Sequence, residues 1–97
     1  MQRKLYFYKL RHMSKLLPTE RWTEARAKLA HKQGQNYTVL IDSIKQPFCV
    51  VDVSSDHVTV EFLDDHLRPA LTYDFQEMRP GRLFLLMATY REYEGGH

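Results

Sequence analysis

The chain has few of the residues that mark disulfides, metal sites or membrane insertion. It contains one cysteine, four glycines and four prolines in 97 residues. One cysteine cannot make an internal disulfide and is one ligand short of the simplest CxxC metal pair. No apolar run approaches the roughly 20 residues that span a bilayer, and the N-terminus lacks the apolar core of a signal peptide. We therefore expect a cytoplasmic protein without a membrane segment, in which Cys49 is a small buried hydrophobe.

Motifs for catalysis, metals and cofactors are also missing from the sequence. The glycines match no phosphate-binding spacing, the five histidines show no HxH, HxxxH or HExxH spacing, and there is no GxSxG elbow. Asp64, Asp65 and His66, with Glu61 nearby, come closest to a metal or acid–base cluster. Adjacent aspartates at a hairpin tip more often bind the turn amides. The sequence predicts no catalytic residue, no metal and no cofactor, and hence a protein that is not an enzyme.

The rest of the composition is that of one folded domain. Hydrophobic residues make up 43% of the chain and charged residues 27%, which is ordinary for a folded protein. The length suits one core, so we predict a single domain over residues 1–97 with a frayed end at 94–97. Residues 1–33 carry a net charge of +7 (nine Lys/Arg, two Glu), and residues 34–97 carry −5 (five Lys/Arg, ten Asp/Glu). Such a split is informative about partners rather than about fold.

Alternating apolar and polar residues predict six strands. A period of two gives a strand one apolar face and one wetter face. The predicted strands cover residues 3–10, 37–44, 48–53, 57–63, 71–75 and 83–93. Within the last, Leu83–Met87 is apolar on both faces, so we expect this strand to be central or heavily covered on both sides.

One segment has a helical period instead. The apolar residues of 20–33 fall along one stripe, Thr19 is a plausible N-cap, and Gly34 follows as the stop. The stripe consists of Trp22, Ala25, Leu29 and Ala30. A short amphipathic helix over Val39–Ile44 competes with the strand expected there. With the strand reading, the order is β-α-β-β-β-β-β, an α+β domain with a single antiparallel sheet of five to six strands and one amphipathic helix packed on one face.

Two sets of side chains suggest binding surfaces. Basic residues of the first strand and helix, interleaved with aromatics, suggest a nucleic-acid-binding module in which cations neutralise phosphates. That set is Arg3, Lys4, Lys9, Arg11, Arg26 and Lys28. Tyrosines of the late strands lie beside arginines, a combination enriched at protein interfaces. That set is Tyr73, Tyr90, Arg91 and Tyr93. A third interpretation is a homodimeric cassette-type scaffold or ligand-binding fold, which uses a sheet edge or a tyrosine-lined pocket.

The last 40 residues carry a pattern that resembles a known group of small bacterial proteins. The matching residues are Phe62, Leu63 and Asp64, then Leu71, Tyr73 and Phe75, then Leu83, Phe84 and Leu85, then Tyr90 and Tyr93. This pattern is similar to that of immunity proteins encoded beside polymorphic or contact-dependent toxins, and of some orphan gene-cassette proteins. The basic first strand and helix have no counterpart in the resemblance.

The resemblance implies a protein partner and no chemistry. An immunity protein needs a rigid surface complementary to a cognate toxin domain, and an acidic face is useful when that toxin is a nuclease. The acidic residues that would mimic phosphate spacing are Asp52, Asp56, Glu61, Asp64, Asp65, Asp74 and Glu77. Electrostatic matching of this kind sets encounter rate and specificity more than raw affinity. The resemblance therefore predicts an antitoxin that blocks its toxin by surface occlusion.

Overall fold

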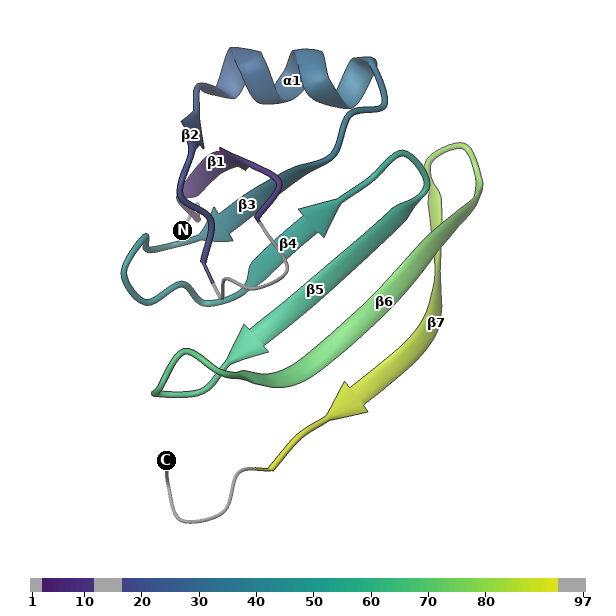
Figure 1. The fold of residues 1–97 in the computed structure, drawn as a ribbon. Helices are drawn as coiled ribbons and strands as arrows, with labels where there is room; N and C mark the ends of the chain where they lie inside the picture. The colour runs from purple at the N-terminus through teal and green to yellow at the C-terminus, as the bar shows by residue number, and fades with distance from the viewer. Residues whose placement is uncertain (1–2, 12–16, 93–97) are drawn as a thin grey trace.

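A computed structural model describes residues 3–11 and 17–92, which form one seven-stranded sheet and one helix (Figure 1). The elements in chain order are β1 (Leu5–Lys9), β2 (Arg21–Trp22), α1 (Glu24–Lys32), β3 (Tyr37–Ile41), β4 (Val50–Val53), β5 (His57–Leu63), β6 (Pro69–Arg79) and β7 (Arg82–Tyr90). The sheet order is β2-β1-β3-β4-β5-β6-β7, and every neighbouring pair is antiparallel. The predicted α+β class and antiparallel sheet are confirmed, but the strand count is seven rather than five to six.

The additional strand lies where the sequence predicts the start of the helix. Arg21 and Trp22 pair with Tyr8 and Phe7 of β1, so they form β2. Thr23 has an extended backbone, and its hydroxyl accepts from the Arg26 amide at 3.1 Å. The helix thus begins at Glu24, and the expected N-cap Thr19 and the placement of Trp22 on the helix are wrong. Strand pairing satisfies the backbone groups of residues 21–22, which a helix would otherwise have used.

The connection through α1 determines where the helix lies. β2 and β3 pair with opposite sides of β1, both antiparallel to it, so β2 and β3 run parallel to each other. α1 connects them by crossing one face of the sheet above β1, and it contacts β1 and β3 (Figure 1). Ala27 and Ala30 face the sheet and are buried. The helix therefore covers the first half of the sheet alone.

The remaining strands form a meander with short turns. Tyr37–Ile41 is a strand, so the competing helix over Val39–Ile44 is wrong. β3 ends at Ile41, just before Asp42, whose φ is 75°. The turn-forming residues Ser54–Asp56 join β4 to β5, and the Ser54 amide donates to the His57 carbonyl at 2.8 Å. β6 and β7 are joined through Pro80 and Gly81, and Gly81 supplies the positive φ of 75° that this turn requires.

The prediction of a central last strand is wrong. β7 is the edge of the sheet, and its residues Leu83–Met87 are between 46% and 57% exposed. The short Pro80–Gly81 turn requires β7 to pair with β6, while the other side of β6 is occupied by β5. Among the described residues, no strand pairs with the outer side of β7. A strand that is apolar on both faces thus does not by itself ensure that other elements cover it.

The core lies in the first half of the sheet. Tyr8, Leu40 and Val50 form a buried cluster across β1, β3 and β4. Leu17, from the connection between β1 and β2, packs against this cluster. Val50 and Leu40 are 0% and 1% exposed.

Candidate functional site: the open face of the sheet

The strand registers place apolar and polar side chains on opposite faces of the sheet. Residues paired across neighbouring strands share a face, so each cross-strand line describes one side. One line is apolar and runs from β1 to β7 through Phe7, Val39, Val51, Val60, Tyr73 and Ala88. The neighbouring line lies on the opposite face and runs through Tyr8, Thr38, Asp52, Thr59, Asp74 and Met87. The first side is the apolar face. We call the second side the polar face, although the buried cluster of Tyr8, Leu40 and Val50 also lies on it at the end formed by β1, β3 and β4.

Among residues 3–11 and 17–92, the apolar face is covered at one end only. α1 packs over β1 and β3, and a small pocket there is lined by Phe7, Ala27 and Tyr37. Val39 under the helix is buried, whereas Val51, Val60 and Tyr73 are half-buried and Ala88 is exposed. We call the apolar side of β4–β7 the open face.

Aromatic rings run across the open face in contact with one another. Phe48 meets Phe62 edge-on at 5.5 Å between ring centroids, Phe62 meets Tyr73 edge-on at 6.1 Å, and Tyr73 lies 6.3 Å from Phe75. We call these four residues the aromatic row. The Arg3 guanidinium lies over the Phe48 ring, 4.1 Å from its centroid. Rings held by neighbouring rings lose little side-chain entropy when a partner covers them, which favours the row as a binding surface.

A cavity of about 420 Å³ adjoins the open face where the end of α1 approaches two hairpins. Val53, Val58 and Leu83 supply apolar walls, and the side chains of His31 and Glu77 lie at the same cavity. The His31 Nδ1 is 3.0 Å from the Tyr37 hydroxyl, which fixes the ring against the sheet. A cavity of this size accommodates one large side chain of a partner.

The polar face is organised around Arg11. Its backbone amide donates to Thr38 Oγ1 at 3.1 Å, and its guanidinium donates to Asp52 Oδ2 at 3.0 Å and to Glu61. Thr38 Oγ1 donates in turn to Asp52 Oδ1 at 2.7 Å. The three charged side chains are 12% to 20% exposed. Burial alone lowers the pKa of Arg11, but hydrogen bonds and charges from Glu61 and Asp52 outweigh it and raise the pKa. Arg11 is therefore a structural cation.

Internal partners engage five of the seven acids expected to form a phosphate-like face. Asp52 and Glu61 hold Arg11. Asp74 accepts from Thr59 Oγ1 at 2.9 Å and lies 3.5 Å from His57. Asp64 accepts from the amides of His66 and Arg68 and from the Arg68 side chain, and Glu77 accepts from the Gly81 amide. Asp56 and Asp65 are exposed in the β4–β5 and β5–β6 turns.

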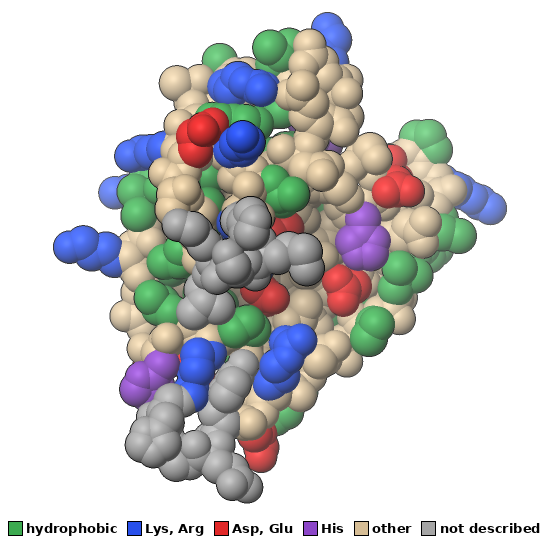
Figure 2. Space-filling model, in the orientation of Figure 1, with side chains coloured by type: hydrophobic (Ala, Val, Ile, Leu, Met, Phe, Trp, Pro, Cys, Tyr) green, Lys and Arg blue, Asp and Glu red, His purple; other side chains and the backbone are tan. Residues whose placement is uncertain are grey.

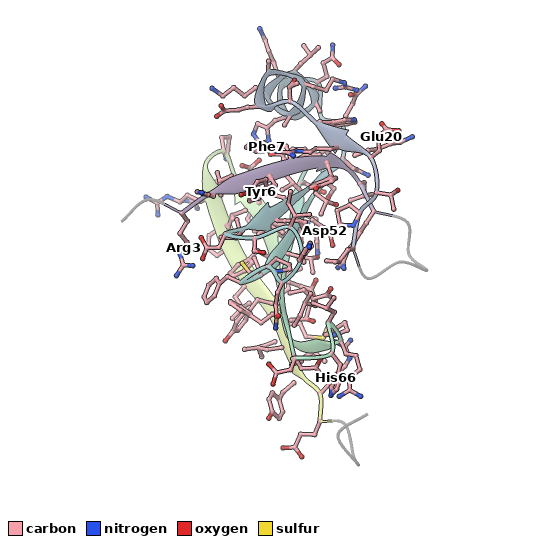
Figure 3. All side chains as sticks on the ribbon, turned by 90° about the vertical axis from the view of Figure 1, so that its left-hand side faces the viewer. Arg3, Tyr6, Phe7, Glu20, Asp52 and His66 are labelled. Atoms are coloured by element: carbon pink, nitrogen blue, oxygen red, sulfur yellow. The ribbon has the colours of Figure 1, made fainter. Side chains whose placement is uncertain are left out.

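The turn acid Asp64 performs the role that its position predicts. Desolvation raises its pKa, but the donors from the Arg68 and His66 amides and from the Arg68 side chain outweigh this, and its pKa falls below the usual value. His66 lies in this turn, at the far end of the molecule from α1 (Figure 3). In the described part of the chain, no three His, Cys, Asp or Glu side chains are placed to hold a metal ion.

The predicted tyrosine and arginine anchors are separated by the fold. Tyr73 belongs to the aromatic row, and Tyr90 at the end of β7 is 70% exposed. Arg91 donates to Thr72 Oγ1 at 3.2 Å on the polar face. Tyr93 lies outside the described residues. Hydrophobic side chains also line the margin of the molecule formed by β6 and β7 (Figure 2).

The basic residues expected for nucleic acid are dispersed as well. Arg3 pairs with Asp42 on the same side as Phe48, whereas Asp52 and its partner Arg11 lie on the opposite side of the sheet (Figure 3). Arg26 stacks on Trp22 at 4.1 Å, and Lys28 lies 3.8 Å from Glu24 on α1. Lys4 and Lys9 are exposed.

Two further sequence expectations concern burial and membranes. Cys49 is a buried free thiol, as expected, and burial raises its pKa. Within residues 3–11 and 17–92, the structure contains no helix with the length and apolar character needed to cross a membrane.

Most of the aromatic row was not predicted from the sequence. Phe48 was expected at the start of a strand, and Phe62 and Phe75 in the family pattern, but their meeting on one face was not foreseen. A signal was present, since Val58, Val60 and Phe62 alternate in phase with Leu71, Tyr73 and Phe75. Pairing these two strands in register predicts a common face, but it does not predict whether anything covers that face.

Comparisons of the chain with protein-family models, with curated proteins and with solved structures found no match.

Proposed function

We propose that this protein is an immunity-type antitoxin that binds a cognate toxin domain through the open face and blocks it by surface occlusion. The aromatic row carries the proposal, because four touching rings on an otherwise apolar sheet face have the composition of an interface hot spot. The resemblance of the last 40 residues to immunity proteins supports the same role. The proposed site differs from the acidic surface expected from the sequence, since five of those seven acids have partners within the chain.

Specificity would come from the polar features at the rim of the open face. Arg3 sits over Phe48 at one end of the row, and Asp56 and Glu77 lie near the cavity at the other. An apolar centre with a charged rim resembles other protein interfaces, in which the centre supplies affinity and the rim selects the partner. The cavity would receive one side chain of the toxin, and its carboxylates favour a lysine or an arginine.

Co-expression with candidate toxin domains encoded by the genes beside this one tests the proposal. The wild-type chain should restore growth and co-purify with the toxin domain. Phe48→Asp and Tyr73→Asp should abolish both, because each places a carboxylate in the centre of the proposed apolar interface.

Leu29→Asp is the matched control. Leu29 on α1 is 49% exposed, close to the 50% of Phe48, but it lies outside the open face. This variant should protect like the wild type. Protection by the two aromatic-row variants, or no protection by the wild type, would refute the proposal. Circular dichroism of each purified variant separates lost binding from lost folding.

A further inference from the structure

The two edges of the sheet differ in a way that points to self-association. β2 presents two residues at one edge, and Arg21 within it stacks over Tyr6 at 5.3 Å. β7 presents nine residues at the other edge, with no charged side chain between Leu83 and Tyr90. Proteins usually shorten, charge or cover edge strands, because unpaired backbone groups template further pairing. β2 shows this protection. The pairing of β7 with β6 has register shifts at Asp74–Phe75 and Glu77–Arg79, but β7 is long, uncharged along its middle and not paired on its outer side by any described strand.

The backbone of β7 is oriented for another strand. The Arg91 amide, which follows β7, donates to the Ala70 carbonyl of β6 at 2.8 Å, so Arg91 and Ala70 form a hydrogen-bonded cross-strand pair. Amide and carbonyl groups alternate in direction along an antiparallel strand. Ala88 and Tyr90 therefore direct their backbone groups away from β6, toward the free side. β7 thus offers a hydrogen-bonding edge as well as apolar side chains.

We propose that a second copy of this chain adds to the β7 edge, so that two sheets join through antiparallel β7–β7 pairing about a two-fold axis. Six large apolar side chains of β7 are roughly half exposed: Leu83, Phe84, Leu85, Leu86, Met87 and Tyr90. At ~200 Å² for a fully exposed large side chain, they expose ~600 Å² per copy. Two copies would cover up to ~1,200 Å², the low end for a specific interface.

Charge complementarity supports a second copy as the occupant. Arg82 stands at the start of β7, and the exposed Glu92 follows its end, while Arg91 is engaged with Thr72. A two-fold axis near Met87 places Arg82 of one copy opposite Glu92 of the other, twice in the dimer. The uncharged middle of the strand then pairs with itself. A dimer of this area is expected to dissociate in the micromolar range.

Sedimentation of the purified chain, from low to high micromolar concentration, tests the inference. The wild type should change from monomer to dimer across this range. Leu86→Lys should weaken dimerisation more than about tenfold, because the two introduced ammonium groups meet near the two-fold axis. Leu29→Lys, with a similarly exposed leucine on α1, should leave it unchanged. A wild type that is monomeric throughout, or a Leu86→Lys variant that dimerises normally, would overturn the inference.

Two further experiments test the arrangement itself, one by charge exchange and one by crosslinking. Arg82→Glu and Glu92→Arg should each weaken the dimer about threefold, and the double exchange should restore it. In a Cys49→Ala background, Met87→Cys should form a disulfide-linked dimer on mild oxidation, because cross-strand Cα atoms about 4.5–5.5 Å apart suit a disulfide. Leu29→Cys should not. If the chain dimerises but Met87→Cys forms no disulfide-linked dimer and the double charge exchange restores nothing, the interface lies elsewhere.

The test is separate from that of the proposed function, since it uses the chain alone. A chain that dimerises but fails to protect against a toxin refutes the antitoxin role and leaves this inference standing. A monomer whose β7 amides become protected from exchange only when a toxin domain is added would assign the edge to that partner, and would refute the dimer.

Discussion

The two halves of the sheet have the same alternating sequence pattern but opposite surroundings. Every buried residue in the described part of the chain precedes residue 51, except Thr72. The first half has α1 on its apolar face and Leu17 with Arg11 on its polar face. The second half, β5–β7, keeps an apolar face without a helix over it (Figure 1). Full burial is therefore concentrated in the first half, while the second half keeps half-buried and exposed apolar side chains.

Leucine truncations should give the largest contrast between the halves. Leu40→Ala removes a side chain that is 1% exposed and should lower the free energy of unfolding by about 3 kcal/mol through lost burial and a cavity. Leu85→Ala removes one that is 54% exposed and should change it by less than ~0.5 kcal/mol. Urea unfolding at a concentration where the chain is monomeric measures both values. Equal losses in unfolding free energy would show that the two halves of the sheet do not differ in stability.

Ion pairs on the two faces of the sheet should give the next contrast. Arg11→Ala leaves Asp52 and Glu61 without their cation in a poorly solvated site, so we expect a loss of about 2 kcal/mol in unfolding free energy. Arg3→Ala breaks an exposed pair with Asp42 and should cost less than ~1 kcal/mol. The same urea titration compares them. If Arg11→Ala lowers the unfolding free energy no more than Arg3→Ala, the ion pairs of the polar face contribute little to stability.

The helix α1, which covers the apolar face of the first half, depends on the residue at which it begins. Thr23→Ala should lower stability by about 1 kcal/mol, because the Arg26 amide loses its side-chain acceptor. Thr19→Ala, at the position favoured from sequence, should be nearly neutral. Thermal unfolding followed by circular dichroism distinguishes the two. A larger loss of stability in Thr19→Ala than in Thr23→Ala would indicate that the helix begins at residue 20.

The smallest effect concerns acid sensitivity in the second half. The pKa of Asp64 is lower in the folded chain than its unfolded value of about 3.9. Its contribution to stability is therefore complete above the unfolded pKa and is lost as pH falls through the folded pKa. Asp64→Asn should flatten this part of the stability curve below about pH 4 and leave the slope near neutral pH unchanged. If the stability of Asp64→Asn falls below pH 4 as steeply as that of the wild type, the β5–β6 turn does not depend on this carboxylate.

Much of the fold was predictable because local pattern and turn chemistry agree. The alternation from Val58 to Phe62 and the turn at Ser54–Asp56 lead directly to β5 and its hairpin. The start of α1 was not predictable, because Arg21–Trp22 has an acceptable helical period and becomes a strand only through pairing with Tyr8 and Phe7. The candidate site was predictable in part, since Tyr73 was selected from its type and position. Phe75 lies two residues along the same strand, but Phe62 comes from β5 and Phe48 from the loop before β4, and these join the row only once the strands are in register.

By itself, the sequence determined the class of the fold, the antiparallel pairing of its later strands and the apolar side of each strand. These follow from a period of two, from turn residues and from one short helix, all of which act over a few neighbouring residues. Only the tertiary structure decided which strand became the edge and which part of the apolar face α1 covered. The physical reason is that cover of the apolar face depends on where the β2–α1–β3 crossover lies, a non-local outcome that leaves Val39 buried near α1 while Val51 and Val60 on the same face stay half-buried.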